Sequence, residues 1–240
     1  MQERNPFEAR AVVGRRGGRT KAPLGRDAII SKALEILASD GLEAMSLRSV
    51  AKALDTGAAS LYVYVDDLSQ LQALVLDRAL AKVATKAARQ KPWQERLLAV
   101  LGSYYQVLTQ HRGLAQLAMS TIATGPHALD LIEALLDILA EAGVDEQTAA
   151  WAVDLIMLYV TAIALEQSQR ANQQDPLAHV ARAIGATSEA THPRIHRVRE
   201  ALLAGDGKTR FSWALQVMLE GILRVPLDPS KLAASAKRRK

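Results

Sequence analysis

The hydrophobic residues of this chain recur at the spacing of an α-helix along nearly its whole length, and the strict alternation typical of β-strands is almost absent. The first helical pattern follows Asp27, a plausible N-cap, and stops at Gly41. Its inward residues are Ile30, Leu34 and Leu37. The pattern therefore predicts an all-α fold.

Short elements follow up to residue 65. Ser46 is placed to cap a helix whose inward positions are Leu47, Val50, Ala51 and Leu54. Asp55-Thr56-Gly57 predicts a tight turn in which Asp55 or Gly57 takes the left-handed conformation. A third helix is expected over Ala58–Val65. Asp66-Asp67, with Gln70 near the capping-box position, predicts a fourth helix over Leu68–Lys91.

The later helices are longer. They are expected over Trp93–Gln110, Leu114–Thr121, His127–Ala142, Asp145–Gln169, Arg194–Leu203 and Lys208–Leu223, with one more starting at Pro176. The longest uncharged apolar run, Leu155–Leu165, is too short to cross a bilayer, which takes roughly 20 residues. The helix around it and the last helix are apolar on more than one face. Two arrangements would bury the additional apolar faces of these helices: an interface between two copies of the chain, or a central position in a monomeric helix bundle.

Basic residues outnumber acidic residues only at the two ends of the chain. Residues 1–26 carry a net charge of +5, residues 229–240 carry +5, and residues 27–228 carry −5. Such tails suit a polyanion, above all nucleic acid, although a solvated tail has the same composition. The segment GRRGGR at residues 14–19 favours nucleic acid, because arginines suit the negative potential of a narrow minor groove.

Residues 27–65 have the spacing of a helix-turn-helix, with three helices and a short turn between the second and the third. Ala51 and Ala53 would let the second and third helices cross closely, and Leu61 and Val65 are expected to be buried. The positions left to meet DNA are Thr56, Ala58, Ala59, Ser60, Tyr62, Val63 and Tyr64. A three-helix packing unit without a ligand fits the same periodicity.

Two segments resemble a known family. The sequence LRSVAKAL at residues 47–54, followed by SLYVYV at 60–65 and by Leu71, resembles the DNA-binding domain of the tetracycline-repressor family of bacterial transcription regulators. The sequence LAGDGKTRF at residues 203–211 looks like the end of that family's C-terminal domain. The resemblance implies a homodimer that reads a two-fold operator in double-stranded DNA and binds a small effector. It also implies four segments: a basic flexible arm (1–25), a helix-turn-helix domain (26–70), an effector-binding and dimerisation domain (71–227) and a basic tail (228–240).

Carried over by position, the DNA contacts are expected at Arg48, Lys52, Thr56, Ala58, Ser60, Tyr62, Val63 and Tyr64. Asp55, Tyr64 and Leu68 depart from the family pattern, and they leave residues 27–68 with three basic and seven acidic residues. The arm is therefore expected to supply further phosphate or minor-groove contacts, through Arg15, Arg16, Arg19 and Lys21.

The effector pocket is expected on the helices that line it in similar proteins, with Tyr104, Tyr105, Leu108, Met119, Ile122, Leu135, Trp151 and Met157 as candidates. Aromatic and methionine side chains suit a largely apolar ligand, but at helical spacing they also fit an ordinary core. Asp154 and Glu166 have the chemistry to anchor a cationic or hydroxylated ligand, or to pair with solvent or with an interface.

Other chemistry is poorly supported. The chain has no cysteine, no HExxH motif and no phosphate-binding glycine loop, and residues 1–26 lack the apolar core of a secretory signal. His192 and His196 are four residues apart, but Pro193 stands between them. We therefore expect a cytoplasmic, dimeric, DNA-binding regulator, most often a repressor, with no enzymatic activity, metal, cofactor or membrane partner. A non-specific DNA binder acting through its tails and a helical small-molecule carrier are the alternatives.

Overall fold

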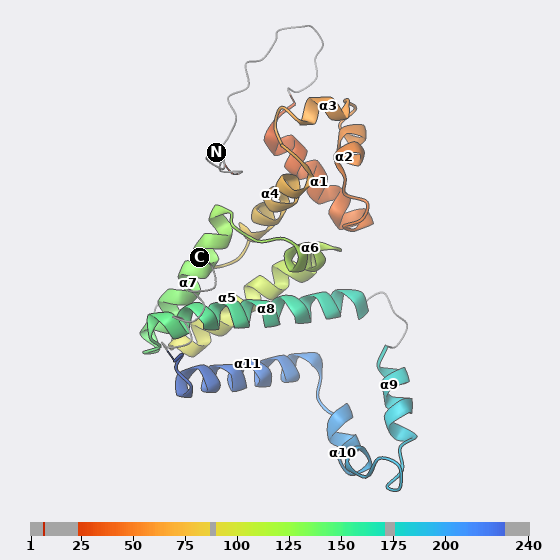
Figure 1. Cartoon of the computed structure of the whole chain (residues 1–240), viewed down its shortest axis with the longest axis vertical. Coiled ribbons are helices and arrows are strands. Elements are labelled where there is room, and N and C mark those ends of the chain that lie inside the picture. The colour runs from red at the N-terminus through yellow and green to blue at the C-terminus, as the bar shows by residue number, and fades with distance from the viewer. Residues whose placement is uncertain (1–6, 8–23, 87–89, 171–175, 229–240) are drawn as a thin grey trace, which may run out of the picture. The chain divides into compact units, whose positions relative to one another are not determined.

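The computed structural model describes residue 7 and residues 24–86, 90–170 and 176–228, with side chains from residue 178 in the last range. These described residues form eleven α-helices and no strand (Figure 1). The predicted all-α class is confirmed.

The first three helices, α1 (Arg26–Asp40), α2 (Leu47–Ala53) and α3 (Ala58–Leu61), enclose a small core. Its completely buried side chains are Ile29, Ala33, Leu37, Val50, Leu61 and Val65. Gly41 ends α1 as predicted, with a φ of 88° that favours glycine. Ser46 caps α2 in a reciprocal capping box, because its hydroxyl accepts the Ser49 N–H at 3.1 Å while its own N–H donates to Ser49 Oγ at 2.9 Å.

Three local expectations were wrong. Gly25, not Asp27, holds the N-cap position of α1, and Asp27 lies in the first turn of that helix. The helix α3 ends at Leu61 and not at Val65, because the chain turns there, with the Tyr64 N–H on the Leu61 carbonyl oxygen at 2.8 Å.

The fourth helix, α4 (Leu68–Leu80), is also shorter than the predicted Leu68–Lys91. Beyond it Val83 is buried, and the Ala84 N–H donates to Ser103 Oγ at 2.8 Å. These contacts with the rest of the fold redirect a segment whose residues are good helix formers. At the other end of α4, Asp67 is the N-cap as expected, and its side chain accepts the Gln70 N–H.

Four longer helices form the body around a leucine-rich core. They are α5 (Trp93–Gln110), α6 (Leu114–Ser120), α7 (Pro126–Glu141) and α8 (Glu146–Arg170), close to the predicted bounds. The helix α4 packs on α5, α6 and α7, and α5 packs on α6 and α7. The largest completely buried side chains are Leu97, Leu101, Leu108, Leu114, Leu117 and Leu131.

By length and composition, α8 is the one helix of the described residues that is apolar enough to cross a membrane. Ala152, Ile156 and Val160 on one of its faces are buried in the body, whereas Trp151 and Leu155 are about half exposed. A core helix of a soluble protein passes the same test, so this property is weak evidence of a membrane.

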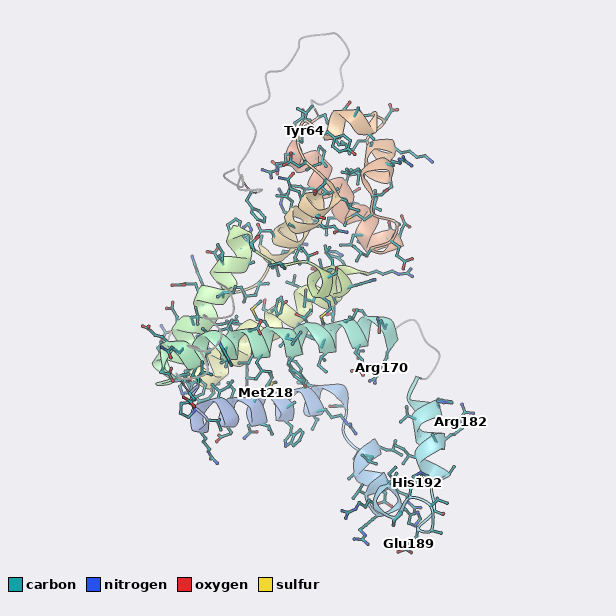
Figure 2. All side chains as sticks on the ribbon, viewed as in Figure 1. Tyr64, Arg170, Arg182, Glu189, His192 and Met218 are labelled. Carbon is teal, nitrogen blue, oxygen red and sulfur yellow. The ribbon has the colours of Figure 1, made fainter. Side chains whose placement is uncertain are left out.

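The chain divides into two compact units, residues 1–165 and residues 166–240. The second unit holds the end of α8, α9 (Pro176–Gly185), α10 (Pro193–Leu203) and α11 (Gly207–Arg224). The helices α9 and α10 form a hairpin with no buried residue in α10, and Arg182, Glu189 and His192 lie on its surface (Figure 2). The four-segment organisation stays a prediction, and its boundary at residue 70 falls inside α4.

Candidate functional site

The turn between α2 and α3 is held by backbone geometry. Asp55 has a φ of 50°, so it is the residue that takes the left-handed conformation. The Thr56 N–H donates to the Ala51 carbonyl oxygen at 3.0 Å and closes the turn, and Gly57 occupies the N-cap position of α3. Aspartate enters this conformation more readily than most residues, so the turn forms without a glycine at position 55.

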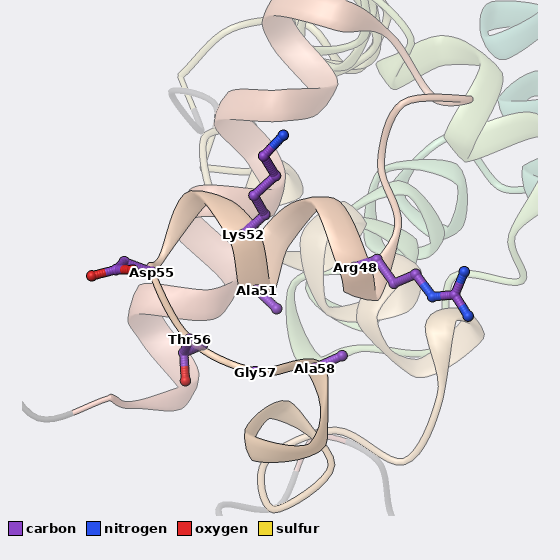
Figure 3. Close-up of a pocket in the computed structure, with 7 residues that line it drawn as sticks. All are labelled: Arg48, Ala51, Lys52, Asp55, Thr56, Gly57 and Ala58. Carbon is purple, nitrogen blue, oxygen red and sulfur yellow. The ribbon is translucent and has the colours of Figure 1, made fainter.

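A surface hollow of about 600 Å³ lies over this turn (Figure 3). It is lined by Arg48, Ala51, Lys52, Asp55, Thr56, Gly57 and Ala58. Arg48 and Lys52 are exposed, and Figure 3 shows that Arg48 and Asp55 point in opposite directions. The Arg48 side of the hollow is therefore the side suited to a phosphate group.

The most exposed apolar side chains near α3 come directly after it. Tyr62 is 53% exposed and Val63 is 48% exposed. Thr56, Ala58 and Ser60, the other predicted contacts of this segment, are half-buried. Because α3 ends at Leu61, Tyr62 and Val63 project from a turn at the end of the helix and not from its side.

Tyr64 is half-buried, and its hydroxyl donates a hydrogen bond to the backbone carbonyl oxygen of Leu24 (Figure 2). The phenolic proton is thus used inside the domain, while the oxygen keeps its capacity to accept. The bond also fixes the chain just before α1. Arg15, Arg16, Arg19 and Lys21, the expected contacts of the arm, lie outside the described residues.

A second site is a cavity of about 400 Å³ inside the first unit. Helices α5, α6, α7 and α8 and the segment after α6 supply its walls. The lining consists of Tyr104, Ala118, Met119, Thr121, Ala123, Ile132, Leu136, Ala150, Val153, Asp154, Met157, Leu158 and Thr161. Its volume falls within the range of small-molecule sites.

Three of the eight candidate pocket residues, Tyr104, Met119 and Met157, line this cavity. The other five lie outside its lining: Leu108 and Leu135 are buried in the core, Tyr105 is half-buried, and Trp151 and Ile122 are exposed. Sequence reasoning did not select the α8 residues Ala150, Val153 and Thr161. Their spacing with Met157 along one helical face is the signal that would have found them.

Tyr104, Thr161 and the Met157 carbonyl oxygen form a hydrogen-bonded chain in the cavity wall. Thr161 Oγ1 donates to the Met157 carbonyl oxygen at 2.8 Å, and the Tyr104 hydroxyl lies 2.7 Å from Thr161 Oγ1. A threonine hydroxyl has one proton, so Tyr104 is the donor in this pair. Burial raises the pKa of Tyr104 and outweighs the opposite effect of the Thr161 hydrogen bond, so the phenol is neutral near pH 7.

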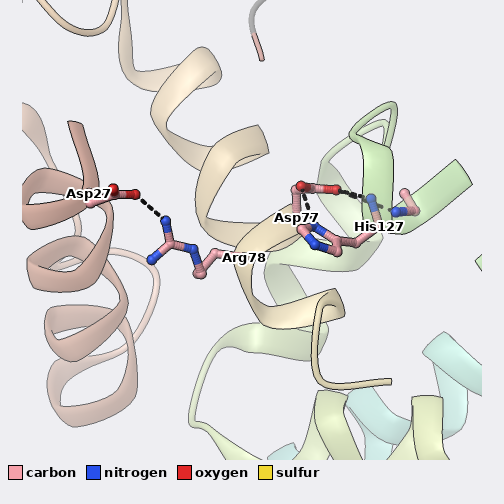
Figure 4. Close-up of polar contacts among 5 residues, drawn as sticks. Asp27, Asp77, Arg78 and His127 are labelled. Carbon is pink, nitrogen blue, oxygen red and sulfur yellow. Dashed lines mark hydrogen bonds and ion pairs between the residues drawn. The ribbon is translucent and has the colours of Figure 1, made fainter. Parts of the chain in front are cut away.

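Two adjacent residues of α4 contact α1 on one side and the start of α7 on the other (Figure 4). Arg78 forms an ion pair with Asp27 of α1. The buried Asp77 carboxylate accepts the His127 N–H at 2.9 Å and the Ala128 N–H at 3.3 Å, and it lies 2.8 Å from His127 Nδ1.

Asp77 thereby caps α7, whose own N-cap residue, Gly125, has no side chain to do so. Gly125 fits tightly there, because a Cβ atom at this position would lie 2.1 Å from Asp77 Oδ1. The next turn of α7 supplies Ile132 to the cavity wall.

Over the described ranges, no group of three or more histidine, aspartate or glutamate residues is arranged to hold a metal ion. His192 stands at the N-cap position of α10, and His196 Nδ1 lies 3.2 Å from the Thr187 carbonyl oxygen.

Comparison with known proteins gives one consistent result. Residues 87–225 match the family model described as the tetracycline repressor-like C-terminal domain. An HTH-type transcriptional regulator of Saccharopolyspora erythraea is 34% identical over 52% of this chain and 53% of its own length. The HTH-type transcriptional repressor DrrR1 of Streptomyces coeruleorubidus is 32% identical over 65% of this chain and 58% of its own length. The chain thus spans little more than half the length of these two relatives.

Among solved structures, apo ActR of Streptomyces coelicolor superposes with a TM-score of 0.78 at 31% identity. The match covers 85% of this chain and 97% of ActR. ActR, described as a TetR family protein, has also been solved in complex with actinorhodin.

Proposed function

Because this chain belongs to the tetracycline-repressor family of transcription regulators, we propose that it is a cytoplasmic, homodimeric repressor that a small, largely apolar effector releases from operator DNA. The observation that carries the proposal is that one compact unit contains both an exposed helix-turn-helix surface and a ligand-sized cavity. The relatives named above are regulators, so the proposal contains no catalytic step and no cofactor.

Operator recognition is assigned to the surface around the turn between α2 and α3. Arg48 and Lys52 suit backbone phosphates, and the exposed Tyr62 and Val63 suit base edges and thymine methyl groups. The remaining proposed contacts are Thr56, Ala58, Ser60 and Tyr64, with Arg15, Arg16, Arg19 and Lys21 from the arm. DrrR1 is a repressor by name, which supports the same sign of regulation here.

A homodimer is supported by apolar surface that each of two helices leaves exposed. On α8, Trp151 is 52% and Leu155 is 49% exposed. On α11, Trp213 is 67% and Val217 is 50% exposed. We propose that α8 and α11 each contribute this face to contacts between two copies of the chain. Successive major grooves on one side of the DNA are about 34 Å apart, which is the spacing that the two reading surfaces of such a dimer have to match.

Coupling between the two sites is assigned to α4. The wall of the cavity includes α7, the start of α7 is held by Asp77, and the neighbouring Arg78 holds α1. A ligand that binds better when α7 has shifted would therefore also shift the helix-turn-helix. This arrangement gives effector binding a continuous physical route to the DNA-binding surface.

The experiment that tests the proposal is a selection of random duplex DNA on the purified protein at physiological salt, with sedimentation to measure its oligomeric state. Enrichment of a palindrome by a dimer is the expected result. Binding without enrichment that disappears at modest salt would instead indicate a non-specific DNA binder acting through the tails. The absence of any DNA binding would favour a small-molecule carrier.

A further inference from the structure

The 400 Å³ cavity carries a charge of one sign. Asp154 is the one acidic side chain in its lining, which includes no lysine, arginine or histidine. Asp154 is exposed, and within the part of the chain that the structure describes it forms no hydrogen bond or ion pair. A carboxylate in this position attracts a cation and repels an anion, and a ligand that displaces water from it strengthens both effects.

The neutral polar groups of the cavity favour the same kind of ligand. Tyr104 gives its proton to Thr161, and Thr161 gives its own proton to the Met157 carbonyl oxygen. The Tyr104 oxygen therefore offers lone pairs and no proton. The Tyr104 oxygen and the Asp154 carboxylate both accept hydrogen bonds, so they favour a ligand that donates hydrogen bonds, as a protonated amine does.

The other lining residues indicate the character of the uncharged part of the ligand. Met119 and Met157 are adaptable and polarisable, and they make favourable contacts with aromatic rings. Ile132, Leu136 and Leu158 complete an apolar wall. The space therefore suits a compact aromatic group that carries one positive charge.

We propose that the effector is a hydrophobic aromatic amine whose ammonium or amidinium group pairs with Asp154 and whose further N–H or O–H donates to Tyr104. This inference rests on the proposed regulatory function, since it names the class of ligand that the cavity senses. It also predicts that aromatic carboxylic acids of the same size are rejected.

The test compares three probes with one ring system on the full-length protein without DNA. They are 9-aminoacridine, which is cationic at neutral pH, acridine, which is neutral, and acridine-9-carboxylate, which is anionic. Affinity is measured by isothermal titration calorimetry. We expect 9-aminoacridine to bind at least tenfold more tightly than acridine, and acridine-9-carboxylate to bind more weakly than either.

Asp154→Asn is expected to abolish that tenfold preference and to leave the affinity for acridine within twofold. The matched control is Asp130→Asn, which removes the same charge from α7 outside the cavity lining and should preserve the preference. The inference is overturned if the carboxylate binds as tightly as the amine, if the preference survives in Asp154→Asn, or if none of the probes binds.

Failure here is distinct from failure of the proposed function. A protein that selects a palindromic operator but prefers the anionic probe refutes the ligand class alone. A protein that selects no DNA but binds 9-aminoacridine through Asp154 refutes the regulator and retains the ligand class.

Discussion

Replacing Asp77 with alanine removes the group that joins α4 to α7. The carboxylate is 7% exposed, and it accepts the His127 and Ala128 N–H groups in addition to its contact with the His127 ring. A hydrogen bond to a charged group contributes about 1.5–3 kcal/mol, and the loss of a helix N-cap costs about 0.5–2 kcal/mol. These contributions overlap, so the expected loss in the free energy of unfolding is about 3 kcal/mol.

Urea unfolding followed by circular dichroism measures that loss. In a thermal scan it corresponds to a fall in melting temperature of roughly 6–12 °C, since 1 kcal/mol shifts a domain of this size by about 2–4 °C. Asp77→Asn is the matched variant, because the His127 and Ala128 N–H groups both bond to Oδ1, which asparagine keeps. It loses only the charge and the contact of Oδ2 with the His127 ring, so it should lose about half as much. A loss below about 1 kcal/mol in Asp77→Ala would show that water replaces the carboxylate, and would refute the assignment of Asp77 as the cap of α7.

Three further outcomes follow from the structure. Tyr62→Ala should lower operator affinity at least tenfold in a fluorescence-anisotropy titration, while sedimentation shows an intact dimer. The control is Ile122→Ala, at another exposed apolar position. Unchanged affinity in Tyr62→Ala would reject Tyr62 as a DNA contact. Deleting residues 1–22 should weaken operator binding and reduce the slope of log affinity against log salt by about 0.9 for each phosphate that the arm neutralises, and an unchanged slope would exclude the arm from the interface. The Asp206 side chain caps α11, and its hydrogen bond from the Thr209 N–H lowers the pKa of Asp206. The stability that this cap gives α11 is therefore present above the ordinary pKa of 3.8 and is lost as the pH falls through the lower pKa of the folded protein. An acid titration of helicity should be flatter for Asp206→Ala than for the unmodified protein, and identical curves would contradict the cap.

The sequence predicted helices well where the decisive signals are local. Gly41, the Ser46 cap and the Asp67 cap act within one turn of the helices that they delimit, so residue order alone reveals them. The end of α4 was not predictable in this way, because Val83 and Ala84 leave the helix to contact distant parts of the fold. No pattern of helix formers encodes such a contact.

The same difference between local signals and distant contacts decides how well the sequence predicted the candidate sites. The turn between α2 and α3 follows from its short-range pattern, and Asp55 proved to be the residue with positive φ. The cavity was predicted only in part, since a methionine or a tyrosine at helical spacing reads alike in a core and in a pocket. The contact of Asp77 with His127 was invisible, because fifty residues separate the two and neither stands in a motif.

The tight fit of Gly125 against Asp77 should be visible in the sequences of related proteins. A side chain at position 125 and a carboxylate at position 77 compete for the same space, since the Cβ atom would lie 2.1 Å from Asp77 Oδ1. A side chain at position 125 fits only where position 77 carries a smaller residue, so related proteins that replace this glycine are expected to have changed position 77 as well. The residues at positions 77 and 125 are thus expected to covary. An aspartate at position 77 with a glycine at position 125 would identify relatives in which α4 caps α7, and other combinations would identify relatives that join the two helices differently.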